Sequence, residues 1–119
     1  MPVDTPAQAR QAMTVRNGFT WGALSGRGIY VLTPVISTGQ LPTEYANRLR
    51  ALQREREAAY LAGKGRDAIP DAPAYVVTSY GTPIAWVTVA GEVVIPPVTY
   101  NPTISRHQAL ARLALVVES

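Results

Sequence analysis

The longest regular pattern in the chain is a helical one. Between Thr43 and about Leu61 the apolar side chains that share one helical face are those of Tyr45, Leu49, Leu52 and Ala59. Thr43 is a suitable N-cap and Gly63 can end the helix. Arg56 interrupts the apolar face. We expect either that its stem lies on the core with the guanidinium group in water, or that it forms an ion pair at an interface.

The last third of the chain has strand-like runs of apolar residues separated by turns. The runs that predict strands are 75–80, 83–89 and 92–100. The first turn is expected near Gly81-Thr82 and the second at Ala90-Gly91. The second turn leaves two registers open, a type I′ turn or a type I turn with Gly91 in a bulge. Pro96-Pro97 must lie at an edge or a bulge, because proline donates no hydrogen bond to a ladder.

Strict alternation along the second of these strands places apolar groups on both faces of the sheet. Ile84 and Trp86 should point to one face, and Ala85, Val87 and Val89 to the other. Both faces therefore need cover, from the rest of the chain or from another subunit.

The first third of the chain predicts a short helix and a hairpin. Thr5-Pro6 can start a helix that runs to about Met13. Two apolar runs, Phe19–Leu24 and Ile29–Val35, flank Ser25-Gly26-Arg27-Gly28, which we expect to form the turn. Gly22 indicates a bulge or a close contact.

A last helix is expected after Asn101-Pro102. Ser105 and Gln108 have the spacing of a capping box. The predicted core-facing positions of this helix are Leu110, Leu113, Ala114 and Val117.

These elements predict an α+β fold. It consists of an antiparallel three-stranded meander, an N-terminal hairpin, one long central helix and a C-terminal helix. We expect a single domain over residues 1–119, with a hairpin and long-helix subregion at 1–73 and a meander and C-terminal helix subregion at 74–119. The sequence leaves open whether the first subregion packs on the second.

Composition excludes several classes of protein. Of the 119 residues 47% are hydrophobic and 16% are charged, which argues against disorder and leaves room for assembly. The absence of cysteine removes disulfides, thiolate nucleophiles and cysteine-held metal sites. No apolar run approaches the roughly 20 residues that span a bilayer, so we expect a soluble protein without a membrane partner.

Basic residues are concentrated in one segment. The net charge is +3, and ten of the eleven basic residues are arginine. This composition suits bidentate contacts to phosphate or carboxylate groups, although a GC-rich genome would also explain it. Candidate contacts to a nucleic acid or a protein are Arg48, Arg50, Arg54, Arg56, Lys64 and Arg66. The alternative for this segment is an ordinary solvated helix face, because Glu55 and Glu57 interrupt it.

Groups able to carry out catalysis are sparse. His107 is the single histidine, and Ser105, two residues earlier, would point to another side of a helix. The eight acidic residues form neither a catalytic pair nor a metal-ligand pattern. Gly26-Arg27-Gly28 lacks the spacing and the following helix of a phosphate-binding loop. We therefore expect a protein that is not an enzyme and has no cofactor and no metal.

The polar start of the last helix is the better candidate for a binding site. Free amide groups at a helix N-terminus, together with nearby basic side chains, favour anions. The candidate residues for anion or partner binding are Tyr80, Thr82, Tyr100, Ser105, Arg106, His107 and Gln108. The alternative is a capped helix whose polar residues only close the meander.

Two motifs resemble a known family. They are Ser79-Tyr80-Gly81-Thr82-Pro83-Ile84-Ala85 and Tyr100-Asn101-Pro102-Thr103-Ile104-Ser105-Arg106-His107-Gln108. Residues 75–113 resemble small uncharacterised domains of bacteriophages and other mobile elements, in which a Ser-Tyr-x-Thr strand precedes a Tyr-Ser-x-Thr-Thr-Ser-Lys/Arg-His-Gln helix start. This chain has Asn101-Pro102 and Ile104 where the family tends to have Ser and Thr. The resemblance implies an origin in an actinobacterial phage or prophage, and no function.

We therefore expect a non-catalytic, phage-encoded accessory protein that binds a host protein or nucleic acid in the host cytoplasm. The alternative is a structural virion component, such as a capsid decoration or connector subunit, stabilised by contacts in a homo-oligomer.

Overall fold

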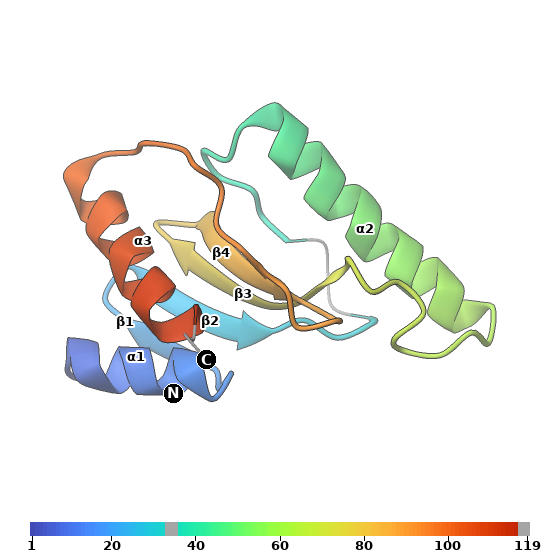
Figure 1. Cartoon of the computed structure of the whole chain (residues 1–119), viewed down its shortest axis with the longest axis horizontal. Helices are drawn as coiled ribbons and strands as arrows, with labels where there is room; N and C mark the ends of the chain where they lie inside the picture. Colours follow the sequence, from blue (N-terminus) through green and yellow to red (C-terminus); the bar gives the residue numbers. More distant parts are fainter. Residues whose placement is uncertain (33–35, 117–119) are drawn as a thin grey trace.

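The computed structural model describes residues 1–32 and 36–116, which form an α+β fold (Figure 1). The described elements, in chain order, are α1 (Pro6–Thr14), β1 (Phe19–Trp21), β2 (Leu24–Gly28), α2 (Thr43–Leu61), β3 (Pro73–Ser79), β4 (Thr82–Thr88), β5 (Val93–Val94) and α3 (Pro102–Leu115).

The strands form one five-stranded sheet in the order β1-β2-β3-β4-β5, and each neighbouring pair is antiparallel. The expected three-stranded meander is therefore part of a longer one. The expectation of a separate hairpin is wrong, because β2 pairs with β3 from Leu24↔Ser79 to Gly28↔Tyr75. The third predicted strand, 92–100, is reduced to Val93–Val94. Pro96 and Pro97 follow after Ile95 and donate no ladder hydrogen bonds.

The N-terminal hairpin turns earlier than predicted. Trp21 pairs with Leu24, so the turn is Gly22-Ala23, and Gly22 has a φ of +58°. A glycine with positive φ at the first central position is typical of a type II′ turn. Residues 25–28, predicted as the turn, belong to β2. The predicted second strand is wrong over residues 29–32, and residues 33–35 lie outside the described part. Ile29 is instead buried in the apolar cluster under α2.

Gly26 has a packing role within the strand. A Cβ atom at Gly26 would lie 2.6 Å from Cε1 of Phe19 and would collide with the hydroxyl group of Tyr75. That hydroxyl group donates a 2.7 Å hydrogen bond to the carbonyl oxygen of Asn17. Burial raises the pKa of Tyr75 to about 12. The close contact predicted for Gly22 thus belongs to Gly26, and the turn predicted around Gly26 belongs to Gly22.

The turns after β3 and after β4 each contain residues with positive φ, as their turn types require. Tyr80 and Gly81, with φ of +50° and +77°, form a two-residue turn between β3 and β4, one residue before the expected position. In the next turn the amide of Gly91 donates to the carbonyl of Thr88 at 2.9 Å, and Gly91 has a φ of +90°. The amide of Thr88 donates to the carbonyl of Glu92 at 2.8 Å. This is the type I turn with a glycine bulge, the second of the two registers left open.

A bulge in β4 changes which side chains share a face. Val77 pairs with Ala85 but Thr78 pairs with Pro83, so Ile84 is an extra residue in the ladder. Ile84 therefore lies in the same cluster as Ala85 and Val87, whereas Trp86 lies in the opposite one. The expectation that Ile84 and Trp86 share a face is wrong, because strict alternation does not hold through a bulge.

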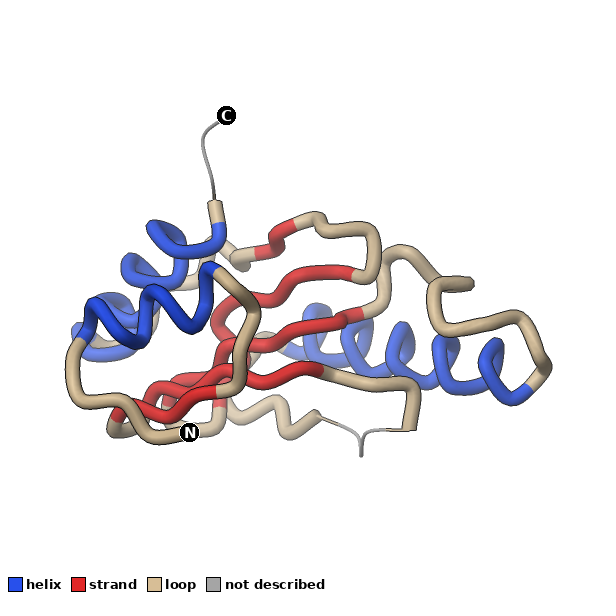
Figure 2. The backbone as a smooth tube through the Cα atoms, turned by 90° about the horizontal axis from the view of Figure 1, so that it is seen from below, coloured by secondary structure: helices blue, strands red, loops and turns tan. Residues whose placement is uncertain are grey.

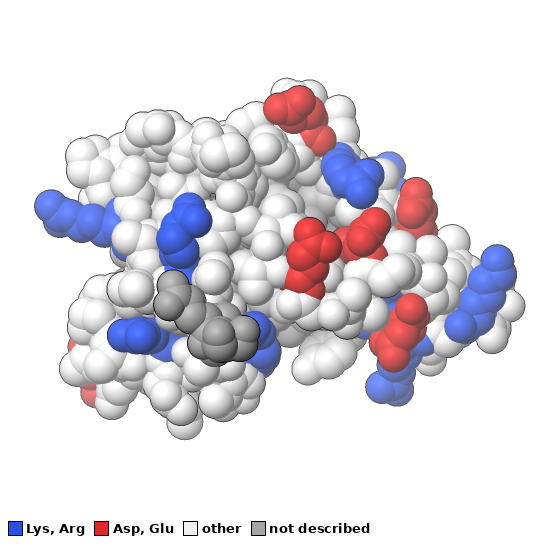
Figure 3. All heavy atoms as spheres, viewed as in Figure 1, with Lys and Arg blue, Asp and Glu red and all other residues white. Residues whose placement is uncertain are grey.

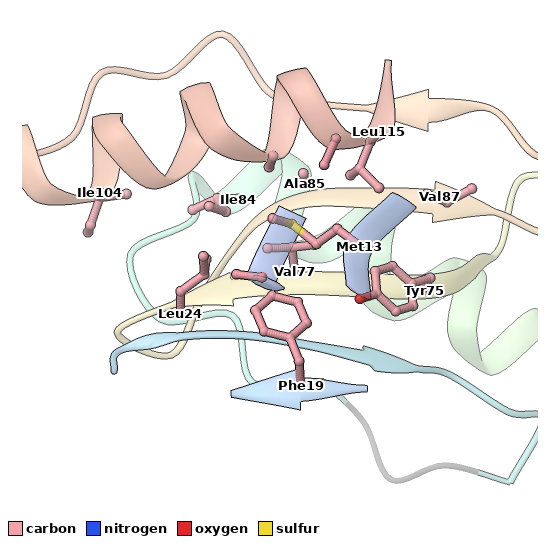
Figure 4. Packing of buried hydrophobic residues seen from close by; sticks show 13 residues of the cluster. Met13, Phe19, Leu24, Tyr75, Val77, Ile84, Ala85, Val87, Ile104 and Leu115 are labelled. Carbon is pink, nitrogen blue, oxygen red and sulfur yellow. The ribbon is translucent and has the colours of Figure 1, made fainter. Parts of the chain in front are cut away.

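One face of the sheet packs on α1 and α3, as Figure 4 shows. The buried cluster between them includes Met13 of α1, Phe19, Val77, Ile84 and Leu115 of α3. The opposite face packs on α2, which lies behind the strands in Figure 2. There Leu49 meets Val76 and Trp86 together with Ile36 and Leu41 of the loop before α2. Both apolar faces are thus covered within the chain, and residues of the first subregion pack on the meander.

The predicted start of the first helix is confirmed. Thr5 caps α1 and forms a capping box with Gln8, and Pro6 is the first helical residue. The bounds of α2 also match, but Pro42 occupies the N-cap position and the predicted cap at Thr43 is wrong. Among the described helices none is long and apolar enough to cross a membrane.

The last helix starts before the predicted capping box. Asn101 is the N-cap of α3 and its Oδ1 accepts a 2.9 Å hydrogen bond from the amide of Ile104. Ser105 lies inside the helix. The buried face also differs from the predicted one: Leu113 is 62% exposed, and Val117 lies outside the described residues. The buried side chains of α3 are Ile104, Ala111, Ala114 and Leu115.

Candidate functional site at the turn between β3 and β4

Two turns and a helix meet at one end of the sheet. Trp21 ends β1, Tyr80 lies in the turn after β3, and the amide of Tyr80 donates a 3.0 Å hydrogen bond to the carbonyl of Ala23 in the neighbouring turn. His107, in the second turn of α3, contacts both rings. Strand pairing and helix packing thus bring together three ring-bearing side chains that are widely separated in sequence.

A buried hydroxyl group fixes the ring of His107. Nδ1 of His107 and Oγ of Ser79 are 2.6 Å apart, and the tautomer of the ring decides which of them donates. Ser79 is 0% exposed. Burial lowers the pKa of His107 from its ordinary value, so neutral imidazole is favoured. Sequence reasoning paired His107 only with Ser105 and missed Ser79, although Ser79 lies in the quoted strand motif.

Two aromatic rings flank this imidazole. The ring of Tyr80 is nearly parallel to it, with an interplanar angle of 22° and centroids 6.5 Å apart. The ring of Trp21 is tilted by 58° at 6.1 Å. Tyr80 is 61% exposed, so most of its ring is accessible to a partner. The positive φ of the turn holds this side chain at the surface.

A hollow of about 360 Å³ opens beside these rings. Its polar lining comes from Arg106, Thr103 and His107, and its apolar lining from Trp21, Leu110 and Pro6. Trp21 and His107 are partly buried, whereas Arg106 is exposed. The hollow therefore combines ring surfaces with the positive charge of the exposed Arg106. We call Trp21, Tyr80, Arg106 and His107 the ring cluster.

The helix-terminus anion site does not form where it was expected. Because α3 starts at Pro102, the amide of Ser105 already donates to the carbonyl of Asn101, at 3.0 Å. Arg106 and His107 lie beyond the first turn and do not extend a set of free amide groups. Their place in the ring cluster depends on strand contacts, not on a helix terminus.

The other residues predicted for this site have different surroundings. The Oγ1 atom of Thr82 is buried and accepts a 2.9 Å hydrogen bond from the amide of Gln40. The hydroxyl group of Tyr100 is buried without a hydrogen-bond partner in the described part of the chain, and burial raises its pKa. Ser105 and Gln108 are half-buried on α3. Of the seven predicted residues, Tyr80, Arg106 and His107 belong to the ring cluster.

The arginines of α2 do not form one continuous surface. Arg56 is buried and its guanidinium group donates to the carbonyls of Ile29, Arg66 and Pro73, at 2.8, 3.0 and 3.2 Å. Neither expectation for Arg56 describes this arrangement, since its guanidinium group is buried on main-chain carbonyls and forms no ion pair among the described residues. The segments that meet under α2 supply carbonyls that the sequence pattern does not reveal.

The remaining basic side chains near α2 are partly engaged as well. Arg50 donates a 2.7 Å hydrogen bond to Oγ1 of Thr38, and Arg48 lies 3.7 Å from the carboxylate of Asp71. Arg54, Lys64 and Arg66 are exposed. Of the six basic residues proposed near α2, these three have side chains that a partner could contact on the surface around α2.

Folding also neutralises the basic segment. Residues 36–100 carry six basic and six acidic side chains. Of the acids that follow α2, Asp71 lies 3.7 Å from Arg48, and Glu92 lines the same cleft as Arg48. Figure 3 shows acidic and basic groups interspersed over this half of the molecule. The excess positive charge lies instead in residues 1–32 and 101–116, mostly on α1 and α3; Arg27 pairs with Val76 and therefore lies on the face of the sheet that packs on α2. Residues 1–32 and 101–116 carry five arginines and one acid: Arg10, Arg16, Arg27, Arg106 and Arg112 against Asp4.

A second cleft lies between α2 and the edge formed by β4 and β5. It has a volume of about 320 Å³, and Trp86 and Leu49 form part of its wall. Arg48, Asp71 and Glu92 line it together, so opposite charges meet at one opening. Trp86 is only 6% exposed and offers little ring surface to a ligand. This cleft is therefore the weaker candidate. Among the described residues no group of His, Asp and Glu side chains could hold a metal ion.

Comparison of the chain with models of protein families, with curated proteins and with solved structures finds no match.

Proposed function

We propose that this chain is a non-catalytic binding protein, an accessory protein encoded by a bacteriophage, which recognises a macromolecule of the host through the ring cluster. The observation that carries this proposal is a hollow lined by Trp21, His107 and Arg106, with the exposed ring of Tyr80 stacked near that of His107. Exposed aromatic and arginine side chains are the groups most enriched among residues that dominate binding energy at interfaces. The phage origin is supported by the resemblance of residues 75–113 alone.

The setting of His107 supports binding rather than catalysis. A serine nucleophile activated by histidine must meet its substrate, and Ser79 has no exposed surface. The contact between Ser79 and His107 instead orients a ring that helps to line the hollow. We therefore assign the pair a positioning role in the binding surface.

The cover on both faces of the sheet favours an accessory protein over a virion subunit. The alternative of a virion subunit depended on an apolar face of the sheet that neighbouring subunits would cover. Here α1 and α3 cover one face and α2 covers the other. A binding protein that works in the host cytoplasm needs no further subunit to complete this core.

The test is affinity capture from a lysate of an actinobacterial host, with bound protein identified by mass spectrometry and bound nucleic acid by extraction. Wild-type protein should retain a partner that Arg106→Ala and Trp21→Ala lose. Arg54→Ala, an exposed arginine of α2, is the matched control and should retain it. Melting temperatures are measured for all variants, to show that each is folded and as stable as the wild type. Capture that is equal for the wild type and both ring-cluster variants would refute the proposal.

A further inference from the structure

We infer that the ring cluster binds single-stranded nucleic acid, with an unstacked base in the hollow beside Trp21 and the backbone along α1 and α3. This inference rests on the proposed function and names its partner. It is carried by three observations: the ring faces, the form of the hollow and the distribution of charge.

The ring faces suit a base. Tyr80 is 61% exposed, and Trp21 forms part of the lining of the hollow. Stacking of a base on an aromatic side chain stabilises single-strand complexes and tolerates any sequence, because every base has a π-face. His107 lies between the two rings, and Ser79 holds its orientation. The three rings therefore present a preformed platform.

The size of the hollow suits a single base. Its volume of about 360 Å³ lies at the lower end of the ~300–1,000 Å³ typical of small-ligand sites. Leu110 and Pro6 close it with apolar surface, whereas Thr103 and Arg106 add polar groups. A base within a duplex cannot enter such a hollow, because its faces are covered by neighbouring bases. Recognition of this kind requires a strand whose bases are unstacked.

The charge around the hollow suits a polyanion. Arg106 lines it, and Arg10 of α1 and Arg112 of α3 are further exposed basic residues on the two helices of this face, where Asp4 is the one acid of the described segments 1–32 and 101–116. Figure 3 shows this half of the molecule with basic groups well spread and acidic groups nearly absent. Arginine neutralises phosphates and releases counterions, which makes such binding depend on salt. The α2 side, where basic and acidic residues balance, offers no comparable attraction.

The test is fluorescence anisotropy with labelled single strands of about 12 nucleotides, within the ~4–16 nucleotides that comparable sites cover. DNA and RNA strands and a duplex of the same sequence are compared across a salt series. We expect the single strands to bind more tightly than the duplex. Trp21→Ala should weaken binding at least about fivefold. Arg106→Ala should weaken it and lower the slope of log K against log salt by about 1.

Two further variants keep the test decisive. Tyr80→Asn removes a ring while placing in the turn a residue that accepts positive φ, so this variant should fold and bind more weakly. Arg54→Ala should bind as the wild type does, which distinguishes the ring cluster from the arginines of α2. Equal affinity for single strand and duplex would overturn the inference, as would unchanged affinity in both the Trp21 and Tyr80 variants.

Failure of the inference can be told apart from failure of the proposed function. Oligonucleotides that do not bind, together with a host protein whose capture depends on Trp21, would overturn the nucleic-acid partner and leave the proposed function in place. If neither an oligonucleotide nor a host protein binds, the inference and the proposed function are both refuted.

Discussion

Arg56 is the residue whose replacement tests the structure most directly. Its guanidinium group donates to carbonyls from three segments, at Ile29 after β2, Arg66 after α2 and Pro73 at the start of β3. The residue is 8% exposed, and burial lowers its pKa from the ordinary value. Arg56→Met keeps the length and apolar stem of the side chain but removes every donor. The carbonyls of Ile29 and Pro73, whose bonds to Arg56 are buried, then lose these partners.

The expected loss of stability follows from those two carbonyls. A buried polar group left without a partner costs about 1–3 kcal/mol, so two such groups cost roughly 2–6 kcal/mol. Removing a buried charge returns part of this, because the desolvation of the guanidinium group is no longer required. We expect the free energy of unfolding to fall by about 3 kcal/mol. For a domain of this size that corresponds to a melting temperature lower by roughly 10 °C.

Urea unfolding followed by circular dichroism measures this change. Arg54→Met is the matched control, since Arg54 is exposed on the same helix and its replacement should change the free energy by no more than about 0.5 kcal/mol. Arg56→Lys should also destabilise, because an ammonium group cannot reproduce the guanidinium fork. The reasoning is refuted if Arg56→Met and Arg54→Met unfold at the same urea concentration with the same slope.

Three further predictions follow from single contacts. Gly26→Ala should destabilise the protein by about 1–3 kcal/mol in thermal unfolding, because its Cβ would collide with Tyr75; an unchanged melting temperature would show that the rings yield freely. Tyr100→Phe should raise the free energy of unfolding by about 1 kcal/mol, since the hydroxyl group is buried without a partner among the described residues; a loss would reveal a hydrogen bond to it. In the folded protein burial lowers the pKa of His107, so as the pH falls the imidazole is protonated in the unfolded chain before it is protonated in the folded one. The contribution of His107 to the free energy of unfolding should therefore be complete above about pH 6.5 and decline as the pH falls below that value. His107→Gln should remove this decline between about pH 7.5 and 5.5, and a decline of equal size in the variant would assign it to other groups.

Local signals were enough to predict much of the secondary structure. Thr5, Pro6 and Gln8 together define the start of α1, and the apolar period defines α2 from Thr43 to Leu61. The α+β class follows from the order of these elements. Such features depend on residues within a few positions of one another, so the sequence displays their causes directly.

The features that could not be predicted depend on contacts between distant segments. Gly26 is required by the ring of Tyr75 across the ladder, and nothing near Gly26 in the sequence distinguishes it from a turn glycine. The bulge at Ile84 follows from pairing with β3 and reverses the face expected from alternation. Ile29 ends the pairing of β2 with a 2.8 Å hydrogen bond to the carbonyl of Ala74, and its side chain is buried in the cluster under α2.

The same distinction explains the candidate site. Ser79 and His107 are 28 residues apart and become partners because α3 crosses the end of β3. The basic segment around α2 attracts attention in the sequence, yet Asp71 returns to lie beside Arg48, and residues 36–100 carry no net charge. What a polyanion would sense is the excess of one sign that remains after folding, and this excess lies over α1 and α3. A search by charge density along the chain therefore selects α2, whereas the net charge of each packed layer directs the search to α1 and α3.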